Sequence, residues 1–136
     1  MDDQLKEMVR DRAHSRCEYC LMPEAYSVLP YELEHIIARK HGGRTEANNL
    51  AYSCFYDNSF KGPNIAGLDP KTGKITGLFH PRRHRWNAHF RWKGAELIGR
   101  TAIGRTTIAV LSINHPLRVD QRRLLMEVGL FPKTGE

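Results

Sequence analysis

The chain of 136 residues is long enough for one modest domain with its own core, and a hydrophobic content of 40% excludes a disordered tail. Its net charge of +6 is unevenly distributed: residues 1–35 carry four basic and eight acidic side chains, whereas residues 36–136 carry seventeen basic and seven acidic ones. This asymmetry favours a polyanionic partner, although a solvated basic face explains it equally well. No apolar run approaches the length needed to cross a membrane.

The N-terminal half predicts short elements around polar turns. Apolar residues recur near helical spacing over residues 3–14, which indicates an amphipathic helix, and a tight Cys-x2-Cys turn follows it. The next predicted elements are a strand at 31–37, a polar glycine-containing loop at 38–49, a strand at 50–54 and a short helix at 55–61.

The C-terminal half begins with a turn-rich segment, residues 62–77, which is expected to run over the surface. Aromatic and basic side chains then alternate up to residue 93, and the core is the favoured place for the two tryptophans. A strand at 95–100 and two helices, at 102–113 and 118–129, complete the prediction. Three arginines of these last helices are expected as surface charge: Arg105, Arg122 and Arg123.

Cys17, Cys20 and Cys54 have the spacing of ligands in a tetrahedral zinc site, whose fourth ligand is expected at position 57. That position holds Asp57, which would share a helix face with Cys54. A carboxylate oxygen is an acceptable zinc ligand, so we predict that Asp57 completes the site. The alternatives left open are three buried apolar thiols without metal, and His14 or a water as the fourth ligand.

Glu34 and His35 adjoin in the first predicted strand, and Asn58 and Lys61 lie one helical turn apart downstream. One-metal phosphodiester hydrolysis needs an oxygen-ligated cation, a base for the attacking water and positive charge on the phosphate. Glu34 and Asn58 are suitable ligands for Mg²⁺ or Mn²⁺, His35 is a suitable base, and Lys61 could hold the phosphate. Because consecutive strand residues point to opposite faces, Glu34 and His35 can act together only at a twist or a strand end.

The whole pattern, "CEYC … ELEHIIARKHGG … ANNLAYSCFYDNSFKG", resembles the HNH endonuclease family. That family combines Cys-x2-Cys, an acid–His pair on a strand, a Gly-Gly loop, Asn-Leu and a closing Cys-x2-Cys-Asn-x2-Lys helix. The resemblance covers residues 17–62, about a third of the chain, and residue types, order and spacing agree together. The departure is Asp57, where zinc-bearing members have cysteine.

The resemblance implies an α+β fold with a ββα-metal core, a zinc knuckle and additional flanking helices. It implies that His35 is the general base, that Glu34 and Asn58 are metal ligands, and that Asn49 holds the loop and orients His35 through a backbone contact. It further implies products with 5′-phosphate and 3′-hydroxyl ends.

Outside the resemblance, residues 80–93 offer further candidates. His80 is a candidate third metal ligand or phosphate contact, a plain structural histidine being the equal alternative, and the same holds for His89. Three arginines of this segment are expected to neutralise phosphates: Arg82, Arg83 and Arg85.

These observations predict one domain over residues 1–136, with an HNH core at about 14–63 and a basic extension at 64–136. We expect an endonuclease that acts on DNA with Mg²⁺ or Mn²⁺, holds a structural Zn²⁺, has no membrane partner and resides in the reducing cytoplasm, where cysteines favour metal over disulfides. The alternative is a catalytically silent zinc-knuckle protein that binds nucleic acid. A basic protein–protein adaptor would leave the matching spacings unexplained.

Overall fold

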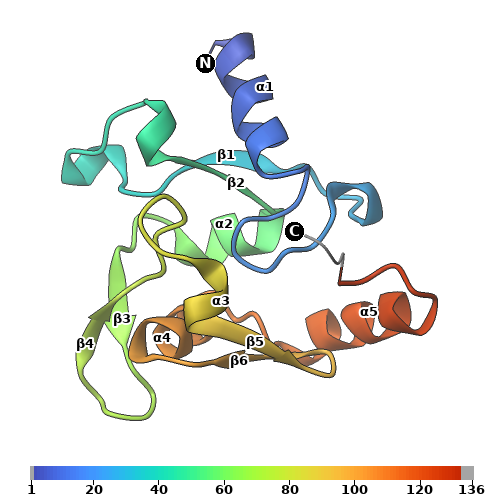
Figure 1. Ribbon diagram of the computed structural model, residues 1–136. Coiled ribbons are helices and arrows are strands. Elements are labelled where there is room, and N and C mark those ends of the chain that lie inside the picture. The colour runs from blue at the N-terminus through green and yellow to red at the C-terminus, as the bar shows by residue number, and fades with distance from the viewer. Residues whose placement is uncertain (1, 133–136) are drawn as a thin grey trace.

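The computed structural model describes residues 2–132, which form short helices and three separate antiparallel hairpins (Figure 1). The helices are α1 (Asp3–Arg12), α2 (Phe55–Lys61), α3 (Trp86–His89), α4 (Ala102–Val110) and α5 (Pro116–Glu127). The strands pair in sequence order as β1 (Glu32–His35) with β2 (Leu50–Ser53), β3 (Ala66–Leu68) with β4 (Ile75–Gly77), and β5 (Phe90–Lys93) with β6 (Glu96–Gly99). The expected α+β class is confirmed.

The β1–β2 hairpin and α2 form the expected ββα unit. In the hairpin, Glu34 lies opposite Ala51 and His35 opposite Leu50. Helix α2 begins directly after β2, because the Cys54 Sγ caps it by accepting the Asp57 backbone N–H at 3.4 Å. The unit therefore joins a two-stranded ribbon to a short helix within thirty residues of chain.

The N-terminal segment covers this unit from one side. Helix α1 starts at an Asp2 cap, whose carboxylate accepts the Gln4 N–H, and packs against β2. The chain then turns back on itself through an isolated bridge between Arg16 and Pro23, which encloses the Cys-x2-Cys turn. This return brings the first two cysteines beside Cys54 and Asp57 at the start of α2.

The C-terminal half packs around α4, which contacts β6 and the β3–β4 hairpin. The approach is close at Gly104, where an added Cβ would lie 2.1 Å from the His89 carbonyl oxygen. The predicted last strand and the two final helices are found as β6, α4 and α5. The β3–β4 hairpin was not predicted, because its three-residue strands contain glycine and carry little alternation, and β5 was not predicted because it is only four residues long.

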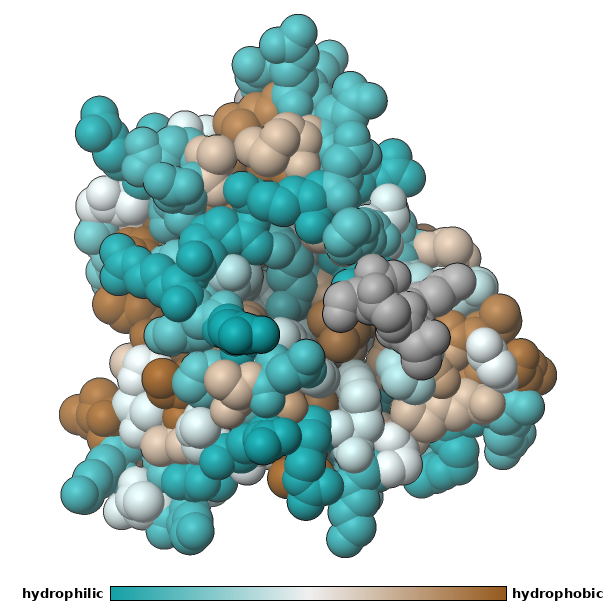
Figure 2. All heavy atoms as spheres, in the orientation of Figure 1, coloured by the Kyte–Doolittle hydropathy of each residue, from teal (hydrophilic) through white to brown (hydrophobic). Residues whose placement is uncertain are grey.

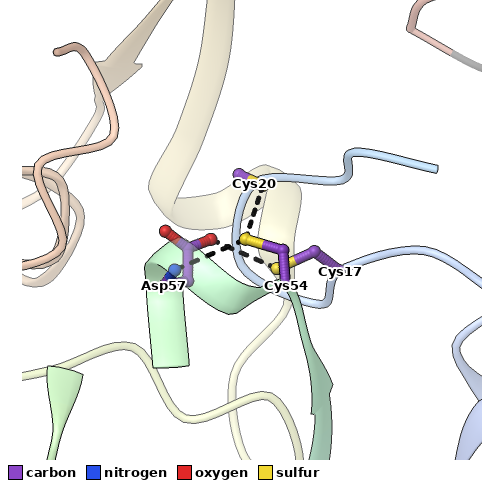
Figure 3. A group of neighbouring side chains, drawn as sticks. All are labelled: Cys17, Cys20, Cys54 and Asp57. Carbon is purple, nitrogen blue, oxygen red and sulfur yellow. Dashed lines mark hydrogen bonds between the residues drawn. The ribbon is translucent and has the colours of Figure 1, made fainter. Parts of the chain in front are cut away.

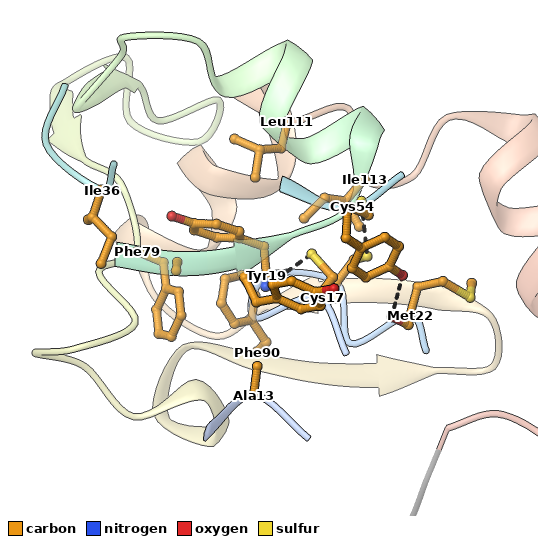
Figure 4. Close-up of a cluster of buried hydrophobic side chains, with 14 of the residues drawn as sticks. Ala13, Cys17, Tyr19, Met22, Ile36, Cys54, Phe79, Phe90, Leu111 and Ile113 are labelled. Atoms are coloured by element: carbon orange, nitrogen blue, oxygen red, sulfur yellow. Dashed lines mark hydrogen bonds between the residues drawn. The ribbon is translucent and has the colours of Figure 1, made fainter. Parts of the chain in front are cut away.

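The core lies between the two halves, and aromatic rings fill much of it (Figure 4). Phe79 contacts the rings of Tyr19 and Phe90 edge-on, and Cys17 and Cys54 belong to the same buried cluster. Trp86 and Trp92 are half-buried and pack against it, as expected. Each fully buried large side chain contributes about 1.5–3 kcal/mol relative to an exposed one.

The expected surface arginines of the last helices divide into three cases. Arg122 is 1% exposed and donates to the Ala95 carbonyl, so the expectation of a surface charge is wrong there. Arg105 is half-buried and holds the buried Asp69 carboxylate through two hydrogen bonds, whereas Arg123 is exposed. The face seen in Figure 1 is mainly hydrophilic, with hydrophobic side chains over α5 and over the β3–β4 hairpin (Figure 2).

Candidate active site and metal centre

Glu34 is buried inside the ββα unit, although it is an acidic residue. Its Oε1 accepts a 2.6 Å hydrogen bond from the Tyr19 hydroxyl and lies 3.6 Å from the Lys61 Nζ. Its Oε2 is buried without a hydrogen-bond partner among the described residues. Burial raises the pKa of Glu34 to about 7, although Lys61 acts in the opposite direction. An orphaned, buried carboxylate oxygen fits a cation ligand.

Lys61 was expected to hold the phosphate, but the structure places its ammonium in the interior. Its side chain is 1% exposed, and its Nζ donates a 2.8 Å hydrogen bond to the Ile36 carbonyl oxygen. The ammonium is buried because its two partners, that carbonyl and the Glu34 carboxylate, both lie at the end of β1. Lys61 therefore neutralises an internal acid and leaves the surface without its charge.

His35 is the last residue of β1, so the strand end required by the sequence argument is present. The imidazole is half-buried, and its Nε2 lies 2.8 Å from the Thr45 Oγ1 in the loop that follows. Burial, and then the charge of Arg39, lowers the pKa of His35 below its ordinary value of 6.5. The side chain is therefore neutral at pH 7, the state in which it can accept a proton.

Asn49 braces the loop between the two strands. Its Oδ1 accepts the Ile37 N–H, and its Nδ2 donates to the carbonyl oxygens of Ile37 and Arg44, all at 2.9 Å. The loop is tight: a Cβ added at Gly43 would lie 1.7 Å from the Ile37 carbonyl oxygen. Asn49 thus fixes the backbone two residues beyond His35 and touches the loop that carries Thr45.

Asn58 lies one residue after Asp57 on α2 and is half-buried. Its backbone N–H donates to the Cys54 carbonyl, and its own carbonyl accepts the Gly62 N–H at the helix end. Helix α2 packs against β1, so the segments that carry Asn58 and Glu34 are neighbours.

The cysteine cluster is the second centre, and it brings two distant segments together (Figure 3). The Cys17 Sγ lies 3.2 Å from the Asp57 Oδ2, and the Cys20 and Cys54 Sγ atoms are 3.8 Å apart. All four ligand atoms lie within 4.8 Å of one another, and all four residues are buried. Sulfurs bound to a tetrahedral zinc at about 2.3 Å are about 3.8 Å apart, so the cluster fits this ion.

Protonation in this cluster is governed by burial and by contacts among its members. Burial raises the pKa of Cys17, whereas hydrogen bonds with Cys17 and Cys54 lower the pKa of Cys20. Burial also raises the pKa of Asp57 to about 7. Because bound thiolates and carboxylates are deprotonated, a cation that binds here must displace protons.

One partner of this cluster comes from far along the chain. The Arg118 Nη2, on α5, donates a 2.8 Å hydrogen bond to the Asp57 Oδ1. The sequence carries no signal for this contact, nor for the roles of Tyr19 and Thr45, because each depends on tertiary packing.

Residues 17–64 match the model of the HNH endonuclease family. This segment is therefore similar to an HNH domain. No curated protein and no solved structure matches the chain. The matched segment contains the ββα unit, the cysteine cluster, Glu34 and His35, and it ends three residues after α2. No helix within residues 2–132 is both long and apolar enough to cross a membrane.

His80 lies beyond the matched segment, in the turn before α3. Its Nδ1 accepts the Arg82 backbone N–H at 3.2 Å, and its own N–H donates to the His84 Nδ1 at 2.9 Å. Burial, followed by the charges of Arg83 and His84, lowers the pKa of His80 to about 4. Only its Nε2 remains for a metal or a phosphate. His89 is half-buried, with its Nδ1 2.6 Å from the Thr101 Oγ1.

The three arginines expected on phosphates differ in their surroundings. Arg82 is 15% exposed; its guanidinium pairs with Glu18 and also donates to the Leu50 carbonyl oxygen. Arg82 as a phosphate contact stays a prediction, and in the free protein its charge is paired with that of Glu18. Arg83 and Arg85 are exposed.

Proposed function

We propose that the chain is a divalent-metal-dependent endonuclease that hydrolyses DNA phosphodiester bonds and leaves 5′-phosphate and 3′-hydroxyl ends. The observation that carries this proposal is the HNH match over residues 17–64 together with the ββα unit that holds Glu34, His35 and Asn58. That unit supplies oxygen ligands for a cation and a base for the attacking water.

His35 is assigned as the general base that removes a proton from the attacking water. Its lowered pKa keeps the ring neutral at pH 7, as a base requires. If the Nε2 carries the ring hydrogen and donates a hydrogen bond to the Thr45 Oγ1, the Nδ1 is the unprotonated nitrogen that can accept a proton from water. Asn49 acts as a positioning residue, because its three hydrogen bonds hold the loop that supports Thr45.

Glu34, through its unpartnered Oε2, and Asn58, through its amide oxygen, are assigned as ligands for Mg²⁺ or Mn²⁺. His80 is the candidate third ligand, through its Nε2. When bound, such a cation offsets charge on the phosphate and on the leaving 3′ oxygen.

Zinc is assigned to Cys17, Cys20, Cys54 and Asp57 as a structural ion. The supporting observation is the fit of the four buried ligand atoms to a tetrahedral ion. The ion would tie the Cys-x2-Cys turn to the start of α2 and so fix Asn58 relative to β1. In a small domain, the binding energy of such an ion adds directly to the folding free energy.

DNA is the assigned partner, held in part by the exposed Arg83 and Arg85. We also assign residues 1–136 to one domain in the reducing cytoplasm. Two contacts support the single domain: Arg118 of α5 binds Asp57 of α2, and the Trp86 Nε1 donates to the Tyr19 carbonyl at 2.9 Å.

A second candidate is a catalytically silent protein that binds nucleic acid through this surface. The observation that favours it is the buried Lys61 ammonium, which already supplies a positive charge beside Glu34. Analysis of cleavage products separates the two candidates. Plasmid DNA incubated with Mg²⁺ or Mn²⁺ should be cut to products that ligase can rejoin, since ligase requires 5′-phosphate ends. DNA retarded in a gel but left intact at every metal concentration would support the silent protein.

A further inference from the structure

The contact between Arg118 and Asp57 lies at the edge of the cysteine cluster and is well shielded from water. The Arg118 side chain is 9% exposed and that of Asp57 is fully buried. The guanidinium is itself held in place, because its Nη1 donates to the carbonyl oxygens of Leu111 at 2.9 Å and Ser112 at 3.2 Å. Arg118 therefore meets Asp57 with a fixed orientation.

Because of this contact, the two carboxylate oxygens of Asp57 have different surroundings. Arg118 takes Oδ1, and Oδ2 lies on the side of the sulfurs, 3.2 Å from the Cys17 Sγ (Figure 3). A carboxylate turned in this way can offer a cation a single oxygen, which suits a four-coordinate site. A carboxylate with no partner on its outer oxygen would be free to rotate.

Charge gives the contact a second effect. Three thiolates and a carboxylate place four negative charges around a divalent ion, and this excess lies in a buried site where water screens it little. The guanidinium of Arg118 adds one positive charge next to the fourth ligand. Partners that orient and neutralise ligands in this way commonly alter metal affinity by about 10- to 100-fold.

Helix α5 also forms part of the wall beside the cluster. The residues that line a cavity of about 300 Å³ include Cys20 and Cys54 of the cluster and Arg118 and Gln121 of α5. The approach to two of the sulfurs thus runs along a helix that lies outside residues 17–64.

We infer that Arg118 is the positioning residue of the metal centre, and that tight zinc binding by the HNH domain requires helix α5. The inference rests on the zinc site proposed above, but not on catalysis. It makes the C-terminal extension part of the metal centre, although the family match ends before it.

The test compares zinc affinity, measured by competition with a chromophoric chelator, in three full-length variants. Arg118→Met keeps the bulk of the side chain but removes its charge and hydrogen bonds, and Arg118→Lys keeps the charge. The matched control is Arg123→Met on the exposed face of the same helix. Arg118→Met should weaken zinc binding by about 10- to 100-fold and Arg118→Lys by less, whereas Arg123→Met should match the parent.

A second background separates positioning of Asp57 from loss of fold. In an Asp57→Cys chain the fourth ligand is a thiolate with one donor atom, which needs no partner to orient it. Adding Arg118→Met there removes the charge of Arg118 but no orienting contact, so it should weaken zinc binding by less than it does in the Asp57 parent. Cobalt substitution gives an independent signature: Arg118→Met should shift the visible d–d bands of the cobalt-loaded parent chain.

Three results would overturn the inference. The first is a parent chain that binds no zinc, and the second is an Arg118→Met chain whose zinc affinity is unchanged. The third is an equal loss of affinity in the Asp57 and Asp57→Cys backgrounds, which would show that Arg118 does not act by positioning the Asp57 carboxylate. None of these measurements involves nuclease activity, so their outcome is independent of whether the proposed reaction takes place.

Discussion

The Lys61 ammonium lies 3.6 Å from the Glu34 carboxylate, and the two side chains are 1% and 4% exposed. Tyr19 completes the arrangement by donating its hydroxyl to the same carboxylate oxygen. The pair places an internal positive charge beside the acid that is assigned to the catalytic cation. Its contribution to stability depends on the protonation of Glu34.

Replacing Lys61 should therefore destabilise the protein in a pH-dependent manner. Burial raises the pKa of Glu34 from 4.5 to about 7 in the folded chain, so folding favours the protonated acid and this group costs stability as pH rises through that range. Without Lys61 the ionised carboxylate would be buried and unpaired, which costs about 3–5 kcal/mol. Lys61→Met should thus lose about this much stability at pH 8 in EDTA, and less at pH 5.

Chemical denaturation at the two pH values measures this difference. The control is Lys71→Met, an exposed lysine in the β3–β4 turn, which should change stability by no more than about 0.5 kcal/mol. An equal loss for Lys61→Met at pH 5 and pH 8 would show that Glu34 is not the group that Lys61 neutralises.

Removing the Asn49 side chain should loosen the loop that carries Thr45. Asn49→Ala would leave the Ile37 N–H and two carbonyl oxygens without their present partners, at a cost of about 2–3 kcal/mol. Hydrogen exchange should report faster exchange at the Ile37 amide. The exposed Asn48 provides the control, because Asn48→Ala should change neither the free energy of unfolding nor the exchange rate of the Ile37 amide. Slow exchange at Ile37 in Asn49→Ala would contradict the bracing role.

The pH dependence of cleavage should carry the signature of His35. Burial and Arg39 lower the pKa of His35 below 6.5, so activity should fall on the acid side only below that value. Arg39→Gln removes one cause of the lowered pKa and should move this acid limb to higher pH, while the exposed Lys40→Gln should not. The measurement is a profile of kcat/KM against pH for the parent and both variants. If Arg39→Gln does not change the pH at which activity falls on the acid side, His35 is not the titrating group.

DNA affinity should decline with salt in proportion to the phosphates that the exposed arginines contact. Replacing Arg83 and Arg85 together by glutamine should reduce the slope of log affinity against log salt by about 1.8, since each neutralised phosphate contributes about 0.9. Arg123→Gln on α5 is the matched loss of an exposed charge and should leave the slope as it is. If the double variant keeps the parental slope, these arginines belong to a solvated face.

The ββα unit and the cysteine cluster could be predicted from the sequence because their signals are local. The two-residue spacing of Cys17 and Cys20, and the helical spacing of Cys54 and Asp57, each determine geometry within one turn of chain. Joining the two pairs needed only the family pattern, and the structure places all four ligand atoms together.

The partners of these residues could not be predicted, because they are fixed by tertiary packing. Arg118 lies 61 positions from Asp57, and nothing in the spacing of α5 indicates which acid it meets. Lys61 and Arg82 were expected to contact phosphate, and Arg122 was expected as surface charge, because charged side chains are usually exposed. Each is instead buried or half-buried against an acid, a carbonyl oxygen or both, and such partners become visible only in the folded chain.

The most direct test of the proposed endonuclease compares plasmid cleavage by the parent, His35→Ala and His41→Ala. His41 is exposed in the loop after β1 and serves as the matched histidine control. The account predicts cleavage that requires Mg²⁺ or Mn²⁺, stops in EDTA, survives in His41→Ala and falls by about 10²–10⁴-fold in His35→Ala with the fold intact. Cleavage by His35→Ala within about tenfold of the parent, or no cleavage by the parent with either metal, would contradict it.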